Sequence, residues 1–159
     1  MTDQISSGDI NPAIGDMLRA ARDFLAHEHS LFRSLALKPK LIGKGKAVFS
    51  MDLPSAFAGA DGSVHGALFT IIIDSIFGLA VFTALEEIKP IATINLRTDY
   101  IGSIRPGSRA LCAAECEAIT GDVAYVSGKL TSEADGRLLA TGAGAFIVGA
   151  KGPVKGMRL

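Results

Sequence analysis

The stretch that decides the fold runs from Gly62 to Leu85 and reads GSVHGALFTIIIDSIFGLAVFTAL. It carries one formal charge, Asp74, although the 20% charged composition of the whole chain would place about five charges in a segment of this length. A helix that is apolar on every side has to be enclosed, either by lipid or by the rest of a protein domain. The remainder of the sequence decides between these two environments.

A membrane span is the first alternative. Val64–Leu85 is long enough to cross about 30 Å of hydrocarbon. However, an aspartate near the middle of a spanning helix costs about 2.5–3.5 kcal/mol on insertion scales. The nearest basic residues are Lys46 upstream and Lys89 downstream, so no basic anchors flank the stretch closely. We therefore favour a helix that is buried on all sides within a protein domain.

The overall composition is that of one domain without disulfides. The 159 residues include 16 basic and 16 acidic side chains, which argues against a basic surface for nucleic acid or an anionic membrane. Met1–Asp9 lacks the basic and apolar regions of a secretory signal. Cys112 and Cys116 would lie about 13 Å apart on one strand, too far for a disulfide, and their spacing is not that of a zinc site. We expect a cytoplasmic protein.

The segments around the apolar stretch predict one further helix and five strands. Asn11-Pro12 is typical of a helix start, and apolar residues at helical spacing predict a helix to about Leu35. Glycine-containing pairs such as Gly121-Asp122 and Asp135-Gly136 predict hairpin turns between alternating segments. The expected strands are Lys46–Leu53, Ile91–Ile101, Arg109–Thr120, Val123–Thr131 and Arg137–Val148.

The predicted strands determine the fold class. Their inward faces hold mainly Ala, Cys and Gly, which allow a sheet to bend and to approach a helix closely. We expect an α+β fold in which a curved antiparallel β-sheet wraps around the central apolar helix, with an extra N-terminal helix. Residues 1–45 are the predicted helical extension, 46–150 the domain itself and 151–159 a frayed tail.

Two sequence elements resemble those of a known family. In the first, Gly62-Ser63-Val64-His65-Gly66-Ala67 precedes Asp74; in the second, Ala92-Thr93-Ile94-Asn95-Leu96 leads through Tyr100 to Arg105-Pro106-Gly107. At this spacing they resemble the hotdog fold and, within it, the phenylacetate-degradation-type (PaaI-like) acyl-CoA thioesterases, over Lys46–Val148. The resemblance implies hydrolysis of an acyl-CoA by a homodimer or homotetramer. It implies no cofactor, because coenzyme A is part of the substrate.

Asp74 points to similar chemistry without the resemblance. Burying an unpaired carboxylate costs several kcal/mol, and the segment from Gly66 to Leu85 contains no Lys, Arg or His to pair with it. We expect Asp74 to line a cavity, where it acts as a general base or a nucleophile. The purely structural alternative is a carboxylate that accepts hydrogen bonds from hydroxyls such as those of Thr70 or Ser75.

Gly66 stands at the expected N-terminus of the apolar helix, where backbone N–H groups are unpaired. Such an N–H would stabilise the oxyanion formed from a thioester carbonyl; a tight entry turn is the alternative role. Eight residues at 1.5 Å each place Asp74 about 12 Å further along the helix. One carbonyl cannot contact both groups, so we expect a site in which Gly66 of one subunit faces Asp74 of the other.

The resemblance implies roles for further residues. Thr93 matches a hydroxyl that orients the attacking water beside the carboxylate. His65 matches the histidine before the catalytic glycine, and we expect it to brace the loop rather than to act as a base. Ala67 replaces a second glycine of the family and leaves the first N–H available. The apolar residues expected to shape an acyl or aryl pocket are Leu68, Ile71, Phe77 and Phe82.

One position departs from the family pattern. Relatives carry Asn or Gln six residues before the histidine, where this chain has Gly59. The amide of that residue would help to hold the thioester carbonyl or the carboxylate, so Asp61 or a water would have to replace it. A non-catalytic acyl-CoA-binding hotdog module therefore stays as a second hypothesis. Neither hypothesis requires a metal.

Overall fold

The computed structural model describes residues 4–5, 11–16 and 30–150. Its main element is a seven-stranded sheet in the order β1-β2-β3-β5-β6-β7-β4. All neighbouring strands are antiparallel except β1 and β2, which are parallel. The strands are β1 (Gln4–Ile5), β2 (Lys38–Gly43), β3 (Lys46–Asp52), β4 (Ile91–Tyr100), β5 (Arg109–Thr120), β6 (Val123–Ser132) and β7 (Leu138–Val148).

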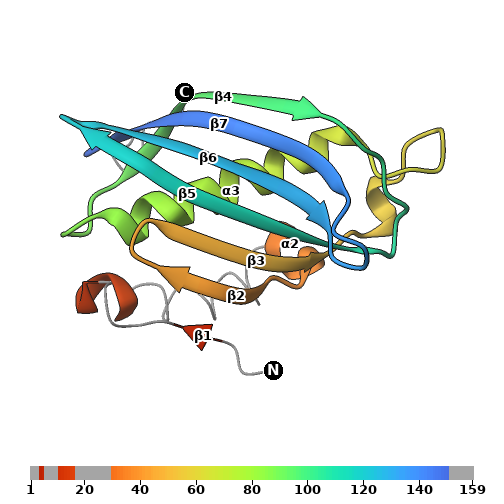
Figure 1. Cartoon of the computed structure of the whole chain (residues 1–159), viewed down its shortest axis with the longest axis horizontal. Coiled ribbons are helices and arrows are strands. Elements are labelled where there is room, and N and C mark those ends of the chain that lie inside the picture. The colour runs from red at the N-terminus through yellow and green to blue at the C-terminus, as the bar shows by residue number, and fades with distance from the viewer. Residues whose placement is uncertain (1–3, 6–10, 17–29, 151–159) are drawn as a thin grey trace.

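The long helix α3 (Gly66–Ala84) lies against one face of this sheet, which curves around it (Figure 1). A short 3-10 helix, η1 (Ser55–Phe57), comes between β3 and α3. The short helix α2 (Ser30–Leu35) lies beside β3. This is the predicted α+β arrangement of a curved sheet around a central helix, and α3 begins at the predicted residue.

One face of α3 forms the core together with the sheet. Each large apolar side chain buried in this way contributes about 1.5–3 kcal/mol. The opposite face is not enclosed: Ile71 is 37% exposed and Asp74 is partly exposed. The expectation that α3 is buried on all sides was wrong, because composition alone does not separate residues that face a sheet from residues that face a pocket. The buried apolar residues of α3 are Leu68, Phe69, Ile72, Ile73, Ile76, Phe77, Ala80 and Val81.

Small residues let α3 approach the sheet closely, as predicted. Gly128 in β6 and Gly142 in β7 lie under the ring of Phe77. A Cβ atom at Gly128 would be 2.6 Å from Cε1 of Phe77, and one at Gly142 would be 3.1 Å from its Cζ. By length and hydropathy α3 could cross a membrane, but half of its apolar window is buried within this structure.

The strand β2 was not predicted. Its sequence, KPKLIG, lacks a clear alternation of apolar and polar residues. It pairs with β3 across a hairpin in which Gly43 is opposite Lys46, and Gly45 in the turn has a φ of +70° that favours glycine. Residues 38–43 therefore belong to the sheet. The predicted extension, residues 1–45, is thus not purely helical.

Parts of the predicted N-terminal helix are described. Oδ1 of Asn11 accepts a 2.9 Å hydrogen bond from the N–H of Ala13 and caps the helical residues 12–16, as the Asn11-Pro12 pattern predicts. The helix α2 ends at Leu35, where the predicted helix also ends. The intervening residues 17–29 and the predicted tail 151–159 lie outside the described residues.

Both cysteines are free thiols, in agreement with their spacing. Cys112 is fully buried in β5, and burial raises the pKa of its thiol to about 12. Cys116 is partly buried near the end of the same strand, and burial raises the pKa of its thiol as well. The fold is thus held by packing and hydrogen bonds rather than by a disulfide.

Candidate active site

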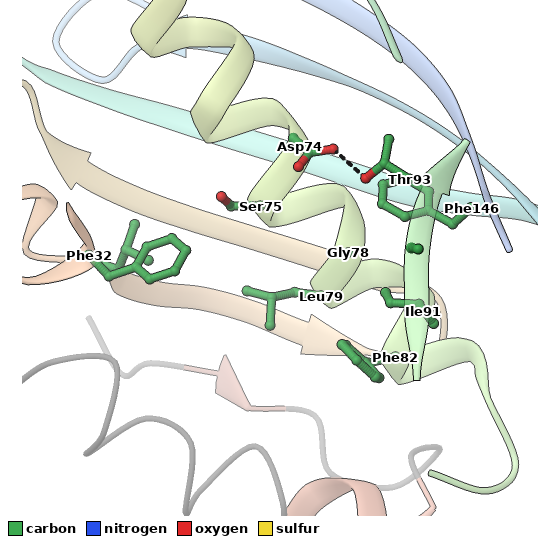
Figure 2. Close-up of a pocket in the computed structure, with 11 residues that line it drawn as sticks. Phe32, Asp74, Ser75, Gly78, Leu79, Phe82, Ile91, Thr93 and Phe146 are labelled. Atoms are coloured by element: carbon green, nitrogen blue, oxygen red, sulfur yellow. Dashed lines mark hydrogen bonds between the residues drawn. The ribbon is translucent and has the colours of Figure 1, made fainter. Parts of the chain in front are cut away.

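A pocket of about 270 Å³ lies along the open face of α3, between this helix, β4 and the N-terminal segment that includes α2 (Figure 2). Its polar lining consists of Asp74, Ser75 and Thr93. The rest of the lining is apolar and comes from four different parts of the chain: Phe32, Leu37, Gly78, Leu79, Phe82, Ile91, Ala92 and Phe146. The pocket therefore joins one carboxylate to a largely apolar space.

Asp74 and Thr93 meet in this pocket. The hydroxyl of Thr93, on β4, donates a 2.8 Å hydrogen bond to Oδ1 of Asp74, on α3 (Figure 2). The register between β4 and β7 shifts between Thr93 and Asn95, and such irregularities redirect side chains. Among the described residues, no group donates a hydrogen bond to Oδ2 of Asp74. That oxygen is available to a water or to a reacting group.

The two hydroxyls considered as structural partners of Asp74 are engaged elsewhere. Ser75 Oγ donates a 2.8 Å hydrogen bond to the carbonyl of Ile71, within the helix. Thr70 Oγ1 lies 2.6 Å from the hydroxyl of Tyr100. The hydrogen-bonding partner of Asp74 thus comes from a neighbouring strand and not from its own helix.

The pocket walls differ from those expected. Of the four apolar residues predicted to shape it, Phe82 lines the pocket, whereas Leu68, Ile71 and Phe77 do not. At 100° per residue, Phe77 lies about 60° from Asp74 in one direction around the helix, whereas Gly78 and Phe82 lie about 40° and 80° from it in the other direction. Phe77 therefore faces the sheet and is fully buried. Its assignment to the substrate pocket was wrong because the rotation around the helix was not considered.

The N-terminus of α3 carries the predicted oxyanion donor. Nδ1 of His65 accepts a 3.1 Å hydrogen bond from the N–H of Ala67, and the carbonyl of His65 accepts one from the N–H of Leu68. The N–H of Gly66 donates to no acceptor among the described residues. His65 thus caps the helix and occupies the amide of Ala67, while the amide of Gly66 stays open.

The loop before α3 contains Gly59 and Asp61. The N–H of Gly59 donates to the carbonyl of Ser63 at 2.7 Å. The carboxylate of Asp61 accepts hydrogen bonds from the N–H and the hydroxyl of Ser63, at 3.0 and 2.7 Å. These bonds hold the pKa of the Asp61 carboxyl below its usual value. Asp61 therefore shapes this loop, and its oxygens are already used within it.

Gly66 and Asp74 do not form one site within a single chain. Because α3 is continuous from Gly66, the two residues are separated by about 12 Å along the helix. One carbonyl cannot lie within hydrogen-bonding distance of both. Of the predicted catalytic residues, the structure brings Asp74 and Thr93 into direct contact. Gly66 and His65 lie at the N-terminus of α3, about two helical turns before Asp74.

Several pocket residues were missed by the sequence analysis. Ile91 and Phe146 lie in predicted strands, but no local pattern connects either of them with Asp74. Phe32 and Leu37 come from the N-terminal part of the chain and carry no recognisable signal.

Among the described residues, no group of three His, Cys, Asp or Glu side chains is placed to hold a metal ion.

Comparisons with known proteins concern the family and the fold of this chain. The sequence model of the thioesterase superfamily matches residues 61–139, about half of the chain. This segment contains the end of the loop before α3 from Asp61 onward, the whole of α3 and the strands β4, β5 and β6. A search of curated proteins finds no match.

Many solved structures are similar. Zebrafish thioesterase superfamily member 2 has a TM-score of 0.72 at 20% identity, over 89% of this chain and 99% of that chain. A hypothetical thioesterase from Streptococcus pneumoniae, solved with coenzyme A, has a TM-score of 0.68 at 16% identity, over 80% and 94%. A mutant of the phenylacetic acid degradation protein PaaI from Thermus thermophilus has a TM-score of 0.65 at 25% identity, over 74% and 96%.

The similarities to the zebrafish and pneumococcal proteins show the fold. The superfamily model matches the segment of the sequence that contains Asp74 and Thr93. The relationship extends over nearly the whole length of each of these proteins. This chain therefore belongs to the thioesterase superfamily, as a hotdog-fold thioester hydrolase of the PaaI-like type.

Proposed function

We propose that this protein hydrolyses an aryl- or fatty-acyl-CoA to the free acid and coenzyme A, with Asp74 at the reacting centre. The observation that carries the proposal is the contact between Asp74 and Thr93 inside a largely apolar pocket. A carboxylate that is fixed at Oδ1 and open at Oδ2 suits attack on a carbonyl carbon, while the apolar walls suit an acyl group. The similar pneumococcal thioesterase was solved with coenzyme A, which supports this class of substrate.

The reaction needs one carboxylate and one oxyanion donor. In the general-base route, Asp74 takes a proton from water as the water oxygen bonds to the thioester carbon; the C–S bond then breaks and the coenzyme A thiolate takes up a proton. In the nucleophilic route, Oδ2 attacks the thioester carbon, the C–S bond breaks and the coenzyme A thiolate leaves and takes up a proton. Water then hydrolyses the mixed anhydride, which releases the acid and restores Asp74. Both routes place negative charge on the carbonyl oxygen, which the N–H of Gly66 stabilises.

The oxyanion donor comes from a second copy of the chain. The separation of about 12 Å between Gly66 and Asp74 along one helix requires a shared site. The strand β4 ends the sheet, so one side of it has no strand neighbour among the described residues. Exposed apolar residues lie on and next to this strand, including Ile94, Tyr100 and Ile101, each more than half exposed. Such an edge favours a homodimer in which Gly66 of the partner subunit faces Asp74.

Gly59 is the observation that favours the second candidate, an acyl-CoA-binding module with little turnover. The side-chain amide is absent at this position, and the carboxylate of Asp61 is engaged by Ser63. If the missing amide is essential for chemistry, the pocket binds acyl-CoA without hydrolysing it.

Release of free thiol from a panel of phenylacyl- and straight-chain acyl-CoA esters tests the proposal. Asp74→Asn and Asp74→Ala are expected to lower kcat by about 10²–10⁴-fold, because each removes the general base or nucleophile. Asp52→Asn is the matched control, because Asp52 is a carboxylate in an exposed ion pair with Arg109. Hydrolysis that is unchanged in both Asp74 variants would reject the role of Asp74. Tight binding without turnover by the unmodified protein would favour the binding module.

Subunit complementation tests the shared site. Asp74→Asn chains and Gly66→Pro chains are purified separately, then mixed and allowed to exchange subunits. A mixed dimer contains one site with an unmodified Gly66 and an unmodified Asp74, so random exchange restores about a quarter of the unmodified activity. A site formed within one chain would give no recovery above the sum of the two variants. A monomer that retains full activity would also contradict the shared site.

A further inference from the structure

We propose that the segment from α2 to the start of β2 sets the longest acyl group that the pocket accepts, through Phe32 and Leu37. This inference rests on the proposed function, since it assigns the apolar part of the same pocket to the acyl chain. The segment lies outside the residues that match the superfamily model. The proposal therefore places the acyl limit in a segment outside the part of the chain that the superfamily model matches.

The position of the two residues carries the inference. Both line the pocket that contains Asp74 and Thr93. In Figure 2 the ring of Phe32 points from α2 toward α3, where Leu79 and Phe82 form the apolar continuation of the pocket beyond Asp74. Phe82 lies eight residues after Asp74, about 12 Å further along the helix. An acyl group whose carbonyl is held at Asp74 therefore extends along α3 past the side chains of Phe32 and Leu37.

The segment that carries Phe32 and Leu37 is held in place at two points. Leu35, the last residue of α2, is buried in the core with 1% exposure. Ala36 then adopts a φ of +45°, a left-handed conformation that turns the chain into β2, which is hydrogen-bonded to β3. Phe32 and Leu37 are thus held by a buried side chain and by a sheet strand, so they form a wall with a defined position.

The size of the pocket indicates the size of the acyl group. An apolar cavity of about 150 Å³ holds one benzene ring, which corresponds to roughly 25 Å³ per carbon atom. On that scale, a pocket of about 270 Å³ holds either a phenyl group with a short linker or a straight chain of about ten to eleven carbons. Longer chains would have to displace Phe32 or Leu37.

Steady-state kcat/KM against acyl length, from two to eighteen carbons, tests the inference on the full chain. In the unmodified protein we expect kcat/KM to fall by about tenfold or more beyond about eleven carbons, as each unburied methylene group loses its contribution to binding. Phe32→Ala is expected to move this limit to acyl chains about four to six carbons longer, because it removes a ring-sized volume. Phe32→Trp is expected to move the limit in the opposite direction, and Leu37→Ala to lengthen it by less.

Two control variants distinguish a direct effect of the pocket lining from a general loss of packing in α2. Leu35→Ala removes a buried anchor of α2 that does not line the pocket, and Arg33→Ala changes an exposed residue on the same helix. A shift of the length limit in both Phe32 variants, in opposite directions, with none in Arg33→Ala, supports the inference. An unchanged limit in Phe32→Ala and Phe32→Trp, or an equal shift in Leu35→Ala, overturns it.

A binding experiment distinguishes failure of the inference from failure of the proposed function. Dissociation constants of the same acyl-CoA esters are measured by calorimetry in the Asp74→Asn background, with and without Phe32→Ala. If the unmodified protein hydrolyses nothing but the length dependence of binding shifts, the proposed function fails and the inference stands. If hydrolysis is observed and neither length profile shifts, the proposed function stands and the inference fails.

Discussion

The ring of Tyr100, at the end of β4, lies against the Cα atom of Gly66, the first residue of α3. A Cβ atom at Gly66 would be 3.1 Å from Cε1 and 3.2 Å from Cδ1 of this ring. The hydroxyl of Tyr100 is hydrogen-bonded to Thr70 one turn further along the helix, at 2.6 Å. Tyr100 therefore spans the first turn of α3 and holds the open amide of Gly66 in a fixed position.

Gly66→Pro and Gly66→Ala form a matched pair that tests this amide. Both add a Cβ atom next to Tyr100, but proline also removes the N–H. Proline suits the first helical position, and the ψ of 130° at His65 is compatible with a following proline. We expect Gly66→Pro to lower kcat by about 10²–10³-fold and Gly66→Ala by about tenfold or less. Equal losses in the two variants would mean that the space beside Tyr100, and not the N–H, is what matters.

Thr93→Val is expected to lower kcat by about 10–100-fold. It removes the hydroxyl that fixes Oδ1 of Asp74, and hydrogen bonds to charged groups contribute about 1.5–3 kcal/mol. Thr93→Ser keeps the hydroxyl and is expected to retain most of the activity. The measurement is kcat for a short acyl-CoA, with circular dichroism to confirm folding. An increase in KM alone, at constant kcat, would indicate a role in substrate binding rather than in orienting the carboxylate.

Glu133 is expected to make stability depend on pH. The hydroxyl of Ser50 donates a 2.7 Å hydrogen bond to its carboxylate, and this bond, together with Arg109 and Lys40, holds the pKa of Glu133 below its usual value. A carboxyl whose pKa is lower in the folded state stabilises the protein above its unfolded-state pKa and loses that contribution as pH falls through the folded-state pKa.

The test compares urea unfolding of the unmodified protein and of Glu133→Gln between pH 7 and pH 3. At pH 7 we expect Glu133→Gln to cost about 1–2 kcal/mol of unfolding free energy. The difference is expected to shrink as the solution is acidified below the ordinary range of glutamate. Glu115→Gln is the control, because Glu115 pairs with Lys46 on an exposed surface, and such pairs contribute about 0–1 kcal/mol. A difference that stays constant with pH would contradict the assignment.

Gly128→Ala and Gly78→Ala are expected to act in opposite directions on stability. A Cβ atom at Gly128 would be 2.4 Å from the carbonyl oxygen of Ala113 and 2.6 Å from Phe77, so we expect a loss of about 3 kcal/mol or more. At Gly78 the nearest atom is Cδ1 of Ile91, at 3.6 Å, and the residue lies within a helix. Alanine there is expected to stabilise the protein by about 0.5–1 kcal/mol. Thermal unfolding measures both changes.

Most of the secondary structure could be predicted from local sequence. The start of α3 at Gly66 and the bounds of β5 at Arg109 and Thr120 agree with the structure, because caps, turns and alternation act over a few residues. The strand β2 could not be predicted in this way. Its residues favour a strand only when β3 supplies hydrogen-bonding partners, and its sequence contains two lysines and a proline.

Some residues of the candidate site could likewise be predicted from local sequence, and others could not. The isolated charge in an apolar segment pointed to Asp74, the expected start of the helix pointed to Gly66, and the family resemblance pointed to Thr93. The sequence misplaced Phe77, which faces the sheet, and did not indicate Phe32 or the contact between Tyr100 and Gly66. These residues matter through contacts between segments that are far apart in the chain.

By itself, the sequence determined that a nearly uncharged helix packs against strands of small residues, because this arrangement buries apolar surface. Only the tertiary structure decided which face of α3 stays open, which strand supplies the partner of Asp74 and which N-terminal residues close the pocket. The physical reason is that helix and turn formation depend on neighbouring residues, whereas the shape of a pocket depends on the packing of distant segments.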